Sequence, residues 1–161
     1  MDNISMIAAI GKNRELGKDN KLIWNIKEDM SFFKETTINK PVVMGRNTYK
    51  SLKKPLKDRK NIILTTRAIE IDDNIVVMRS IENLLKYIEQ YQEEVMVIGG
   101  AQVYNEMLEY AKKLYLTEIE ESYERADTYF PRFNGDLYNV ETLGEYEENG
   151  IKYKRKIYTK K

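Results

Sequence analysis

One carboxylate in this sequence is placed as an acid for proton chemistry would be. Asp29 lies in the segment Leu22–Lys34, shortly after the only tryptophan of the chain, Trp24. A helix that begins at about Ile26 and turns about 100° per residue places Asp29 at the edge of an apolar stripe. Burial disfavours the charged form of a carboxylate, so an acid there holds its proton more tightly and suits proton transfer or the binding of a polar ligand edge.

The neighbouring side chains of this helix sort into two faces. The apolar stripe consists of Ile26, Met30 and Phe33. Glu28 and Glu35 point to the opposite side, where we expect them to be solvated. Helix geometry alone leaves a second interpretation of Asp29 open, because a partly buried acid that is satisfied by backbone or by a nearby lysine would show the same pattern.

The composition narrows the chemistry. The chain has 161 residues with no Cys and no His, which excludes thiol nucleophiles, His-based triads and zinc sites built from thiolates or imidazoles. Acid–base chemistry must therefore use Asp, Glu, Tyr, Lys or bound water. Hard-metal sites built from carboxylates remain open by composition, but the carboxylates lack the spacing of a calcium-binding loop, and we expect no metal site.

Charge and hydropathy indicate an ordinary globular chain. Lys and Arg total 27 against 26 Asp and Glu, so no basic bias indicates nucleic acid. No apolar run reaches the length of a membrane span, and the N-terminus lacks the pattern of a signal peptide. We expect one domain over residues 1–161, located in the cytoplasm, with neither nucleic acid nor a membrane as partner.

Three predicted strands end in segments that suit a nucleotide. These segments are Gly45-Arg46-Asn47-Thr48 after Pro41–Met44, Thr65-Thr66-Arg67 after Asn61–Leu64, and Gly99-Gly100-Ala101-Gln102 after Val95–Ile98. Glycine lets a phosphate approach the backbone, and a following helix offers free N–H groups. Arg46 and Arg67 would favour a 2′-phosphate, hence NADP over NAD. Each segment taken singly is also compatible with simple turn chemistry.

A basic loop, Lys53–Lys60, carries a further candidate. Arg59 follows Pro55 and Leu56 in this loop. A guanidinium can hold a substrate carboxylate through two parallel hydrogen bonds. A solvated basic loop is the alternative.

The elements that would position these residues alternate between strands and helices. Ile4–Ile10 is a continuous apolar run, which is typical of a strand buried on both faces of a parallel sheet. Lys12–Lys21 is polar and is expected to be a loop, either a mobile lid or a plain connection. The remaining strands are predicted at Pro41–Met44, Asn61–Thr66, Ile75–Met78, Val95–Ile98 and Leu114–Ile119, with helices at Arg46–Leu52, after an N-cap at Ser80, and from Ala101 to Tyr110. Asn149-Gly150 predicts a C-terminal hairpin within about Leu137 to Tyr158.

With these segments in order, the chain resembles the dihydrofolate reductase family over nearly its whole length. The segments that carry the resemblance are Ile7-Ala8-Ala9, Asn13-Arg14-Glu15-Leu16-Gly17, Trp24-Asn25 with Asp29, Lys40 to Tyr49, Pro55-Leu56 with Arg59, Asn61 to Thr65, Ile98 to Tyr104, Leu114 to Thr117, and Ala126-Asp127-Thr128 with Phe130-Pro131.

The resemblance implies a fold and an activity. The fold is α/β in three layers, with a central eight-stranded, mostly parallel sheet, an antiparallel C-terminal hairpin and four flanking helices. The activity is the NADPH-dependent reduction of 7,8-dihydrofolate to 5,6,7,8-tetrahydrofolate, with hydride transferred to C6 and a proton to N5. It also implies a supply of tetrahydrofolate for one-carbon metabolism and for thymidylate, purine and glycine synthesis, sensitivity to antifolate inhibitors, and a monomer.

The resemblance also implies roles for individual residues. Catalysis is expected to involve Asp29, Trp24 and Tyr104. The substrate is expected to contact Ile7, Ala8, Asp29, Met30, Phe33, Leu52, Leu56, Arg59, Ile98 and Thr117, with Arg59 on the glutamate α-carboxylate and Thr117 beside the acid. NADPH is expected to contact Ala9, Leu16, Gly17, Gly45, Arg46, Asn47, Thr48, Leu64, Thr65, Thr66, Arg67, Ile98, Gly99, Gly100, Ala101, Gln102, Val103 and Tyr104. The Gly99–Gly100 peptide is expected to be cis, and Asp127 is expected to contact the lid.

The chain departs from the family pattern in its loops. Ile23 stands before Trp24 where proline is usual, and Lys53-Lys54 replaces a pair that usually contains glycine. Lys57-Asp58 and Tyr129 also differ from the common residues. These departures affect loop geometry and inhibitor fit rather than the reaction.

Parts of the sequence are also compatible with two other functions. One is a reductase of the same fold that acts on a pyrimidine intermediate of riboflavin synthesis, against which Trp24, Asp29 and Arg59 argue. The other is a non-catalytic, doubly wound nucleotide-binding or regulatory domain. A phospho-receiver would need paired acids after its first strand, where this chain has Gly11-Lys12-Asn13.

Overall fold

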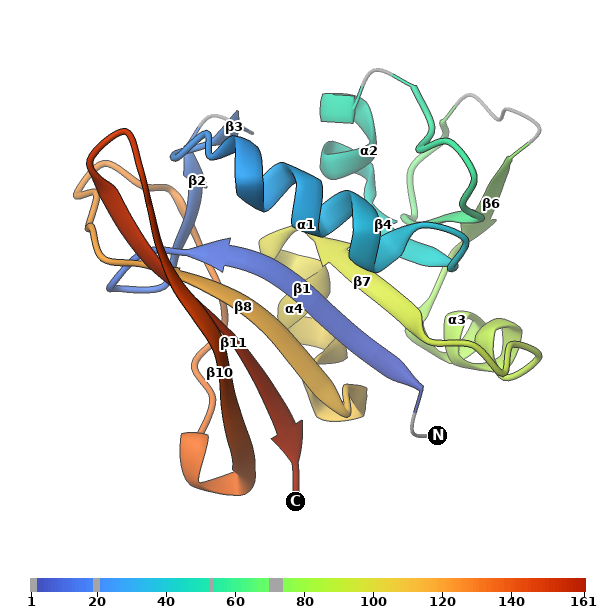
Figure 1. The fold of residues 1–161 in the computed structure, drawn as a ribbon. Coiled ribbons are helices and arrows are strands. Elements are labelled where there is room, and N and C mark those ends of the chain that lie inside the picture. Colours follow the sequence, from blue (N-terminus) through green and yellow to red (C-terminus); the bar gives the residue numbers. More distant parts are fainter. Residues whose placement is uncertain (1–2, 19–20, 53, 70–73) are drawn as a thin grey trace.

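A computed structural model describes residues 3–18, 21–52, 54–69 and 74–161. An eight-stranded sheet in the order β10-β11-β8-β1-β7-β4-β5-β6 forms its centre (Figure 1). The strands of the sheet are β1 (Ile4–Ile10), β4 (Val42–Gly45), β5 (Asn61–Leu64), β6 (Ile75–Met78), β7 (Val95–Gly99), β8 (Lys113–Ile119), β10 (Tyr138–Glu148) and β11 (Ile151–Lys160). The pairs from β8 to β6 are parallel, whereas β11 pairs antiparallel with both β8 and β10. The predicted fold class, with its antiparallel C-terminal hairpin, is confirmed.

Four α-helices cover the two faces of this sheet. They are α1 (Lys27–Thr37), α2 (Arg46–Leu52), α3 (Ile81–Ile88) and α4 (Ala101–Met107). Phe33 of α1 and Leu52 of α2 pack with Ile7 on one face. Leu84 of α3 and Met107 of α4 pack with Met6 on the other. Figure 1 shows α1 crossing in front of the sheet and α4 behind it.

The continuous apolar run Ile4–Ile10 correctly predicted β1, because side chains of this strand are buried on both faces of the sheet. Residues of β1 face the two helical layers in turn, and both layers need apolar contacts. Met6 is fully buried against the α3 and α4 side, and Ile7 is buried against α1. A strand covered on both faces has no position left for a polar alternation.

The segment predicted as a loop at Lys12–Lys21 contains strands, so that prediction was incomplete. β2 (Glu15–Lys18) pairs with β3 (Lys21–Leu22) and with β9 (Thr128–Tyr129) in a small second sheet. The polar composition of this segment pointed to a loop, but Glu15 is a buried strand residue, 2% exposed. Its carboxylate accepts hydrogen bonds from the backbone N–H groups of Asn13 and Tyr123, at 2.7 and 2.6 Å. Asp19 and Asn20 of this segment lie outside the described residues.

Other boundaries moved by one to three residues. Ile26 is the N-cap of α1 rather than a helical residue, and β5 ends at Leu64 rather than Thr66. The helix from Ala101 ends at Met107 and continues as a 3-10 turn, Leu108–Tyr110. A second 3-10 turn, Gly135–Leu137, precedes β10. Lys53, the first residue of the predicted basic loop, lies outside the described residues.

Two local predictions of helix and turn chemistry are confirmed. Ser80 caps α3 by accepting a hydrogen bond from the backbone N–H of Asn83 at 3.1 Å. Asn149 and Gly150 both have positive φ, 53° and 80°, and join β10 to β11. This is the backbone that a tight hairpin between right-twisted strands requires. Within the described part of the chain, no helix is long and apolar enough to cross a membrane.

Candidate active site

Asp29 is the third residue of α1, and its side chain faces strands β8 and β11 of the sheet. Its Oδ1 accepts a hydrogen bond from the Thr117 hydroxyl at 2.5 Å and one from Arg155 Nη2 at 3.2 Å. The side chain is 20% exposed. Burial raises the pKa of Asp29 above its ordinary value, although the hydrogen bonds from Thr117 and Arg155 act in the opposite direction. The site thus holds an acid poised closer to neutral pH than a solvated aspartate.

Apolar side chains line the same face of the sheet beside the acid. Ile7 of β1 packs in one cluster with Phe33, Leu52, Leu56 and Ile98. These residues come from β1, α1, α2, the loop after α2 and β7, so the fold brings together five predicted substrate contacts. Met30 is 52% exposed and lies on the same helix as Asp29. Ala8 packs with the cluster on the opposite face of the sheet, so β1 presents Ile7 and not Ala8 to the acid's side.

Trp24 lies between β3 and α1. Its ring packs with Ala9 against a small cluster of Ile26, Ile119 and Tyr153. The ring also lies directly over Gly11, where a Cβ atom would come within 2.5 Å of Trp24 Cη2. Glycine is therefore required at Gly11 for the tryptophan to reach this position.

Arg59 is buried and is held by the residues around it. Its Nε donates to Thr37 Oγ1 at 3.0 Å, and its two terminal nitrogens donate to the carbonyls of Lys57 and Lys34 at 2.5 and 3.3 Å. A guanidinium has five N–H donors, and these contacts use three of them. Burial lowers the pKa of Arg59 from its ordinary value, and the residue remains a fixed cation with donors to spare.

The ends of β7, β4 and β5 are neighbours in the sheet, as the nucleotide hypothesis requires. The Gly99–Gly100 peptide is cis, and Gly99 has a φ of 136°. Cβ atoms on Gly99 and Gly100 would meet Thr48 Oγ1 at 3.3 and 3.2 Å, and one on Gly45 would meet Val103 Cγ2 at 3.1 Å. Side chains at these glycines would thus fill the narrow space where the three strand ends meet.

Two arginines flank this edge, and one of them was missed in the sequence. Arg46 begins α2, and its Nε is buried without a hydrogen-bond partner among the described residues. Arg79 donates to the carbonyls of Thr65 and Arg67 at 3.2 and 2.6 Å and so fixes the turn after β5. Thr66 and Arg67 are exposed on that turn. Arg79 could have been identified in the sequence, because it directly follows the predicted strand Ile75–Met78.

Further predicted cofactor contacts lie on the α4 side of this edge. Tyr104 is 4% exposed and its hydroxyl donates to the carbonyl of Ile7 at 2.6 Å, beneath Gly99. Burial raises the pKa of Tyr104. Leu16, Leu64 and Val103 pack in the cluster on the α4 face. Gln102 instead bonds Glu106 along the exposed side of α4, at 3.0 Å.

Comparison with known proteins decides the family. The sequence model of the family described as "Dihydrofolate reductase" matches residues 3–160. The chain is 38% identical over 161 residues to dihydrofolate reductase of Bacillus subtilis, covering 98% of this chain and 95% of that one. It is 48% identical over 132 residues to dihydrofolate reductase of Buchnera aphidicola from Acyrthosiphon pisum, covering 81% and 80%. The chain belongs to the dihydrofolate reductase family.

A solved structure agrees with this assignment. A dihydrofolate reductase from Enterococcus faecalis, complexed with NADP(H) and RAB-propyl, superposes with a TM-score of 0.84 at 32% identity and covers 98% of this chain and 95% of that chain. Family membership makes this chain an NADP-dependent oxidoreductase that reduces dihydrofolate.

Within this family fold, one prediction about α1 was wrong. Glu28 is not simply solvated, because Arg155 Nη1 and Nη2 donate to its two carboxylate oxygens at 3.0 and 2.7 Å and the Tyr153 hydroxyl donates at 2.9 Å. Those bonds outweigh burial and lower the pKa of Glu28. Glu35 is exposed as predicted. Helix geometry could not reveal that the C-terminal strand would cover one side of α1.

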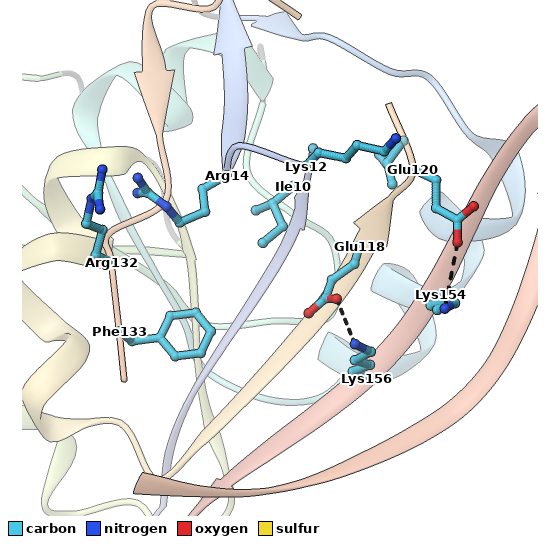
Figure 2. A pocket seen from close by; sticks show the side chains of 11 residues that line it. Ile10, Lys12, Arg14, Glu118, Glu120, Arg132, Phe133, Lys154 and Lys156 are labelled. Atoms are coloured by element: carbon cyan, nitrogen blue, oxygen red, sulfur yellow. Dashed lines mark ion pairs between the residues drawn. The ribbon is translucent and has the colours of Figure 1, made fainter. Parts of the chain in front are cut away.

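A hollow on the other face of the sheet lies apart from the residues expected to bind dihydrofolate. It encloses about 620 Å³ and is lined by Ile10, Gly11, Lys12, Arg14, Glu118, Ile119, Glu120, Arg132, Phe133, Lys154 and Lys156. Figure 2 shows Lys156 paired with Glu118 and Lys154 paired with Glu120, at 3.0 and 3.8 Å. These residues alternate with Thr117 and Arg155 along β8 and β11, so they point away from Asp29.

Proposed function

We propose that the reduction of dihydrofolate takes place on the α1 face of the sheet, beside Asp29. The observation that carries this assignment is one desolvated carboxylate, ordered by Thr117, on the helix whose Phe33 packs into the apolar cluster around Ile7. With no His or Cys in the chain, Asp29 is the acid that suits the reaction. Its pKa, raised by burial, favours holding a proton near the N5 atom of the substrate.

In this proposal the apolar cluster binds the ring system of the substrate. Phe33, Leu52 and Leu56 would contact the pterin and benzoyl groups, with Met30 at the rim, and Trp24 would exclude or order water at the acid. The free donors of Arg59 would hold the α-carboxylate of the glutamate tail through paired hydrogen bonds. Ile7 and Ile98 would form the floor between substrate and cofactor.

The strand ends fit NADPH. Gly45, Gly99 and Gly100 leave the space that a Cβ atom would close, and the buried Nε of Arg46 lacks a partner among the described residues. The residues that would hold the cofactor are Ala9, Leu16, Gly17, Asn47, Thr48, Leu64, Thr65, Thr66, Arg67, Ala101, Gln102, Val103 and Tyr104. When bound, NADPH supplies the hydride that reduces C6 of dihydrofolate.

We further propose that the whole chain, residues 1–161, acts as one domain and as a monomer in the cytoplasm. The main sheet supports the first point, because it is built from strands that run from Ile4 to Lys160. Neither nucleic acid nor a membrane is a proposed partner. Antifolates that present a protonated ring edge would bind at Asp29.

The test is a spectrophotometric assay of NADPH oxidation that depends on dihydrofolate, with NADH as comparison. The parent should turn over with NADPH, and Asp29→Asn should lose at least about a hundredfold in kcat/KM at neutral pH. Glu35→Gln removes an exposed carboxylate from the same helix and should leave the rate unchanged. An Asp29→Asn variant that is folded and fully active would contradict the assignment of the acid.

A further inference from the structure

Arg155 is a buried cation in the middle of the last strand. It is 3% exposed and lies on β11 opposite Thr117 of β8. Its neighbours on the same face, Tyr153 and Ile157, fit an apolar register, whereas Lys154 and Lys156 point to the other face. An arginine at an inward position of a sheet is costly to bury unless charged partners compensate it.

The partners that compensate Arg155 are the two acids at the start of α1. Its guanidinium bonds both oxygens of Glu28, at 3.0 and 2.7 Å, and Asp29 Oδ1 at 3.2 Å. The planar group also lies over the ring of Phe32, 3.9 Å from its centroid, and 5.1 Å from that of Tyr146. Its position is thus determined from the helix, the hairpin and the sheet together.

These contacts act on one oxygen of the acid only. Both Thr117 and Arg155 donate to Oδ1, so the carboxylate plane is fixed by two donors from two strands. Oδ2 accepts no hydrogen bond from the part of the chain that the structure describes, and it remains for a ligand. A carboxylate held in this way meets a substrate without first having to reorient.

We propose that Arg155 is a positioning residue for the acid of the reductase site, and that with Glu28 it sets the orientation and the charge balance of the Asp29 carboxylate. The inference rests on the proposed role of Asp29. It predicts that two residues outside the expected substrate contacts, one on α1 and one on β11, control how the reaction depends on pH.

Among the described residues, charged and titratable side chains lie around Asp29 on α1, β11 and β10, where Glu148 accepts from the backbone of the first turn of α1. Glu28 lies beside it on α1, Arg155 and Tyr153 lie on β11, and Tyr146 lies on β10. Thr117 of β8 is neutral, and Ile7 of β1 is apolar. Burial raises the pKa of Asp29 most strongly, Arg155 lowers it, and the Glu28 charge raises it.

Opposite effects on the pH profile follow from these signs. A protonated Asp29 is needed for turnover, so kcat/KM falls as pH rises through the pKa of the acid. Removing the Arg155 charge favours the protonated form and moves this alkaline limb to higher pH. Removing the Glu28 charge disfavours the protonated form and moves the limb to lower pH.

The experiment measures kcat/KM for dihydrofolate from acid to alkaline pH in Arg155→Met, Arg155→Lys, Glu28→Gln and the parent. We expect the ratio of alkaline to plateau kcat/KM to rise about fivefold or more in Arg155→Met and to fall in Glu28→Gln. Arg155→Lys should restore the limb at least partly toward that of the parent. Lys154→Met is the matched control, because it removes a cation from the adjacent position that points into the opposite hollow (Figure 2), and it should not move the limb.

A second measurement needs no turnover and covers the case in which Arg155→Met folds poorly. Carbon-13 NMR of the Asp29 carboxyl, identified by its absence in Asp29→Asn, gives the titration of the acid in the ligand-free protein. Its midpoint should move down in Glu28→Gln relative to the parent, and this shift does not depend on how Arg155→Met folds. Unmoved limbs and midpoints in all of these variants would overturn the inference, whereas activity retained in Asp29→Asn would overturn the proposed function instead.

Discussion

The buried charged side chains of the described residues are each held in place by several hydrogen bonds. Glu15 accepts from two backbone N–H groups, Arg59 donates to two carbonyls and Thr37, and Arg155 bonds two carboxylates. Burying a charge is costly unless it is paired and hydrogen-bonded. Burying these charged side chains costs free energy, so they are candidates for a role in function or in the control of a functional group.

The Arg59 side chain gives a prediction that separates binding from chemistry. Arg59→Ala should raise KM for dihydrofolate about a hundredfold or more while kcat changes little, because paired hydrogen bonds to a carboxylate are lost. The same variant should handle a dihydropterin that lacks the glutamate tail as well as the parent does. Steady-state kinetics with both substrates check this. An equal loss with both would mean that Arg59 shapes the loop rather than binding the tail.

At the level of single residues, the sequence reveals the acid and, through the family resemblance, its partner Thr117, but not its second partner Arg155. Asp29 could be singled out because an acid at the edge of an apolar helix stripe is unusual. Arg155 broke the apolar register of a strand in the same way, yet its partner lies 126 positions earlier in the chain. A contact between residues so far apart depends on the order of strands in the sheet, which local patterns do not specify.

At the level of elements, buried strands and capped helices were the predictable parts. Ile75–Met78 and Arg46–Leu52 have the predicted bounds, because apolar runs and turn residues act locally. β2 and β3 were missed because β2 is held by backbone pairing with a distant segment around β9, which local patterns do not reveal. Phe130 N donates to the carbonyl of Arg14, and Asp127 N donates to that of Gly17, at 2.8 and 3.0 Å. The predicted contact of the Asp127 segment with the lid is present through these backbone bonds.

The cap of α3 can be tested by a single substitution. Ser80→Ala should lower the free energy of unfolding by about 1 kcal/mol, because the N–H of Asn83 loses its acceptor at the helix start. Ser31→Ala is the control, since it makes the same chemical change inside α1, where alanine favours the helix. Urea denaturation measures both. Equal destabilisation by the two variants would show that the Ser80 hydroxyl has no special role.

At the level of the whole molecule, the C-terminal hairpin completes the site that the N-terminal half begins. β11 pairs with β8 from Tyr153 to Thr159 and so places Arg155 opposite α1. The carboxylate of Glu148, just before the hairpin turn, accepts from the backbone N–H groups of Lys27 and Glu28 at 2.8 and 3.2 Å. The first turn of α1 leaves such groups without partners inside the helix, so the end of the chain caps the helix that carries the acid.

A second carboxylate, Glu94, joins parts of the sheet at the opposite end. It accepts from Ser5 of β1 at 2.5 Å, from Lys40 before β4 at 2.9 Å and from Tyr115 of β8 at 2.9 Å. Burial would raise its pKa, but these three hydrogen bonds outweigh burial and lower the pKa below its ordinary value of 4.5. The ionised form is therefore favoured in the folded state relative to the unfolded one.

The sign of this shift fixes how stability should depend on pH. A group whose pKa is lower in the folded state stabilises the fold above its unfolded pKa, and that contribution is lost as pH falls through the folded pKa. Glu94→Gln should therefore cost about 2 kcal/mol at pH 7, and the gap to the parent should narrow as the pH falls below about 4.5. Urea denaturation at several pH values measures the gap, with the exposed Glu35→Gln as control. A gap that stays constant across this range would mean that Glu94 stabilises the sheet through packing and neutral hydrogen bonds rather than through its charge.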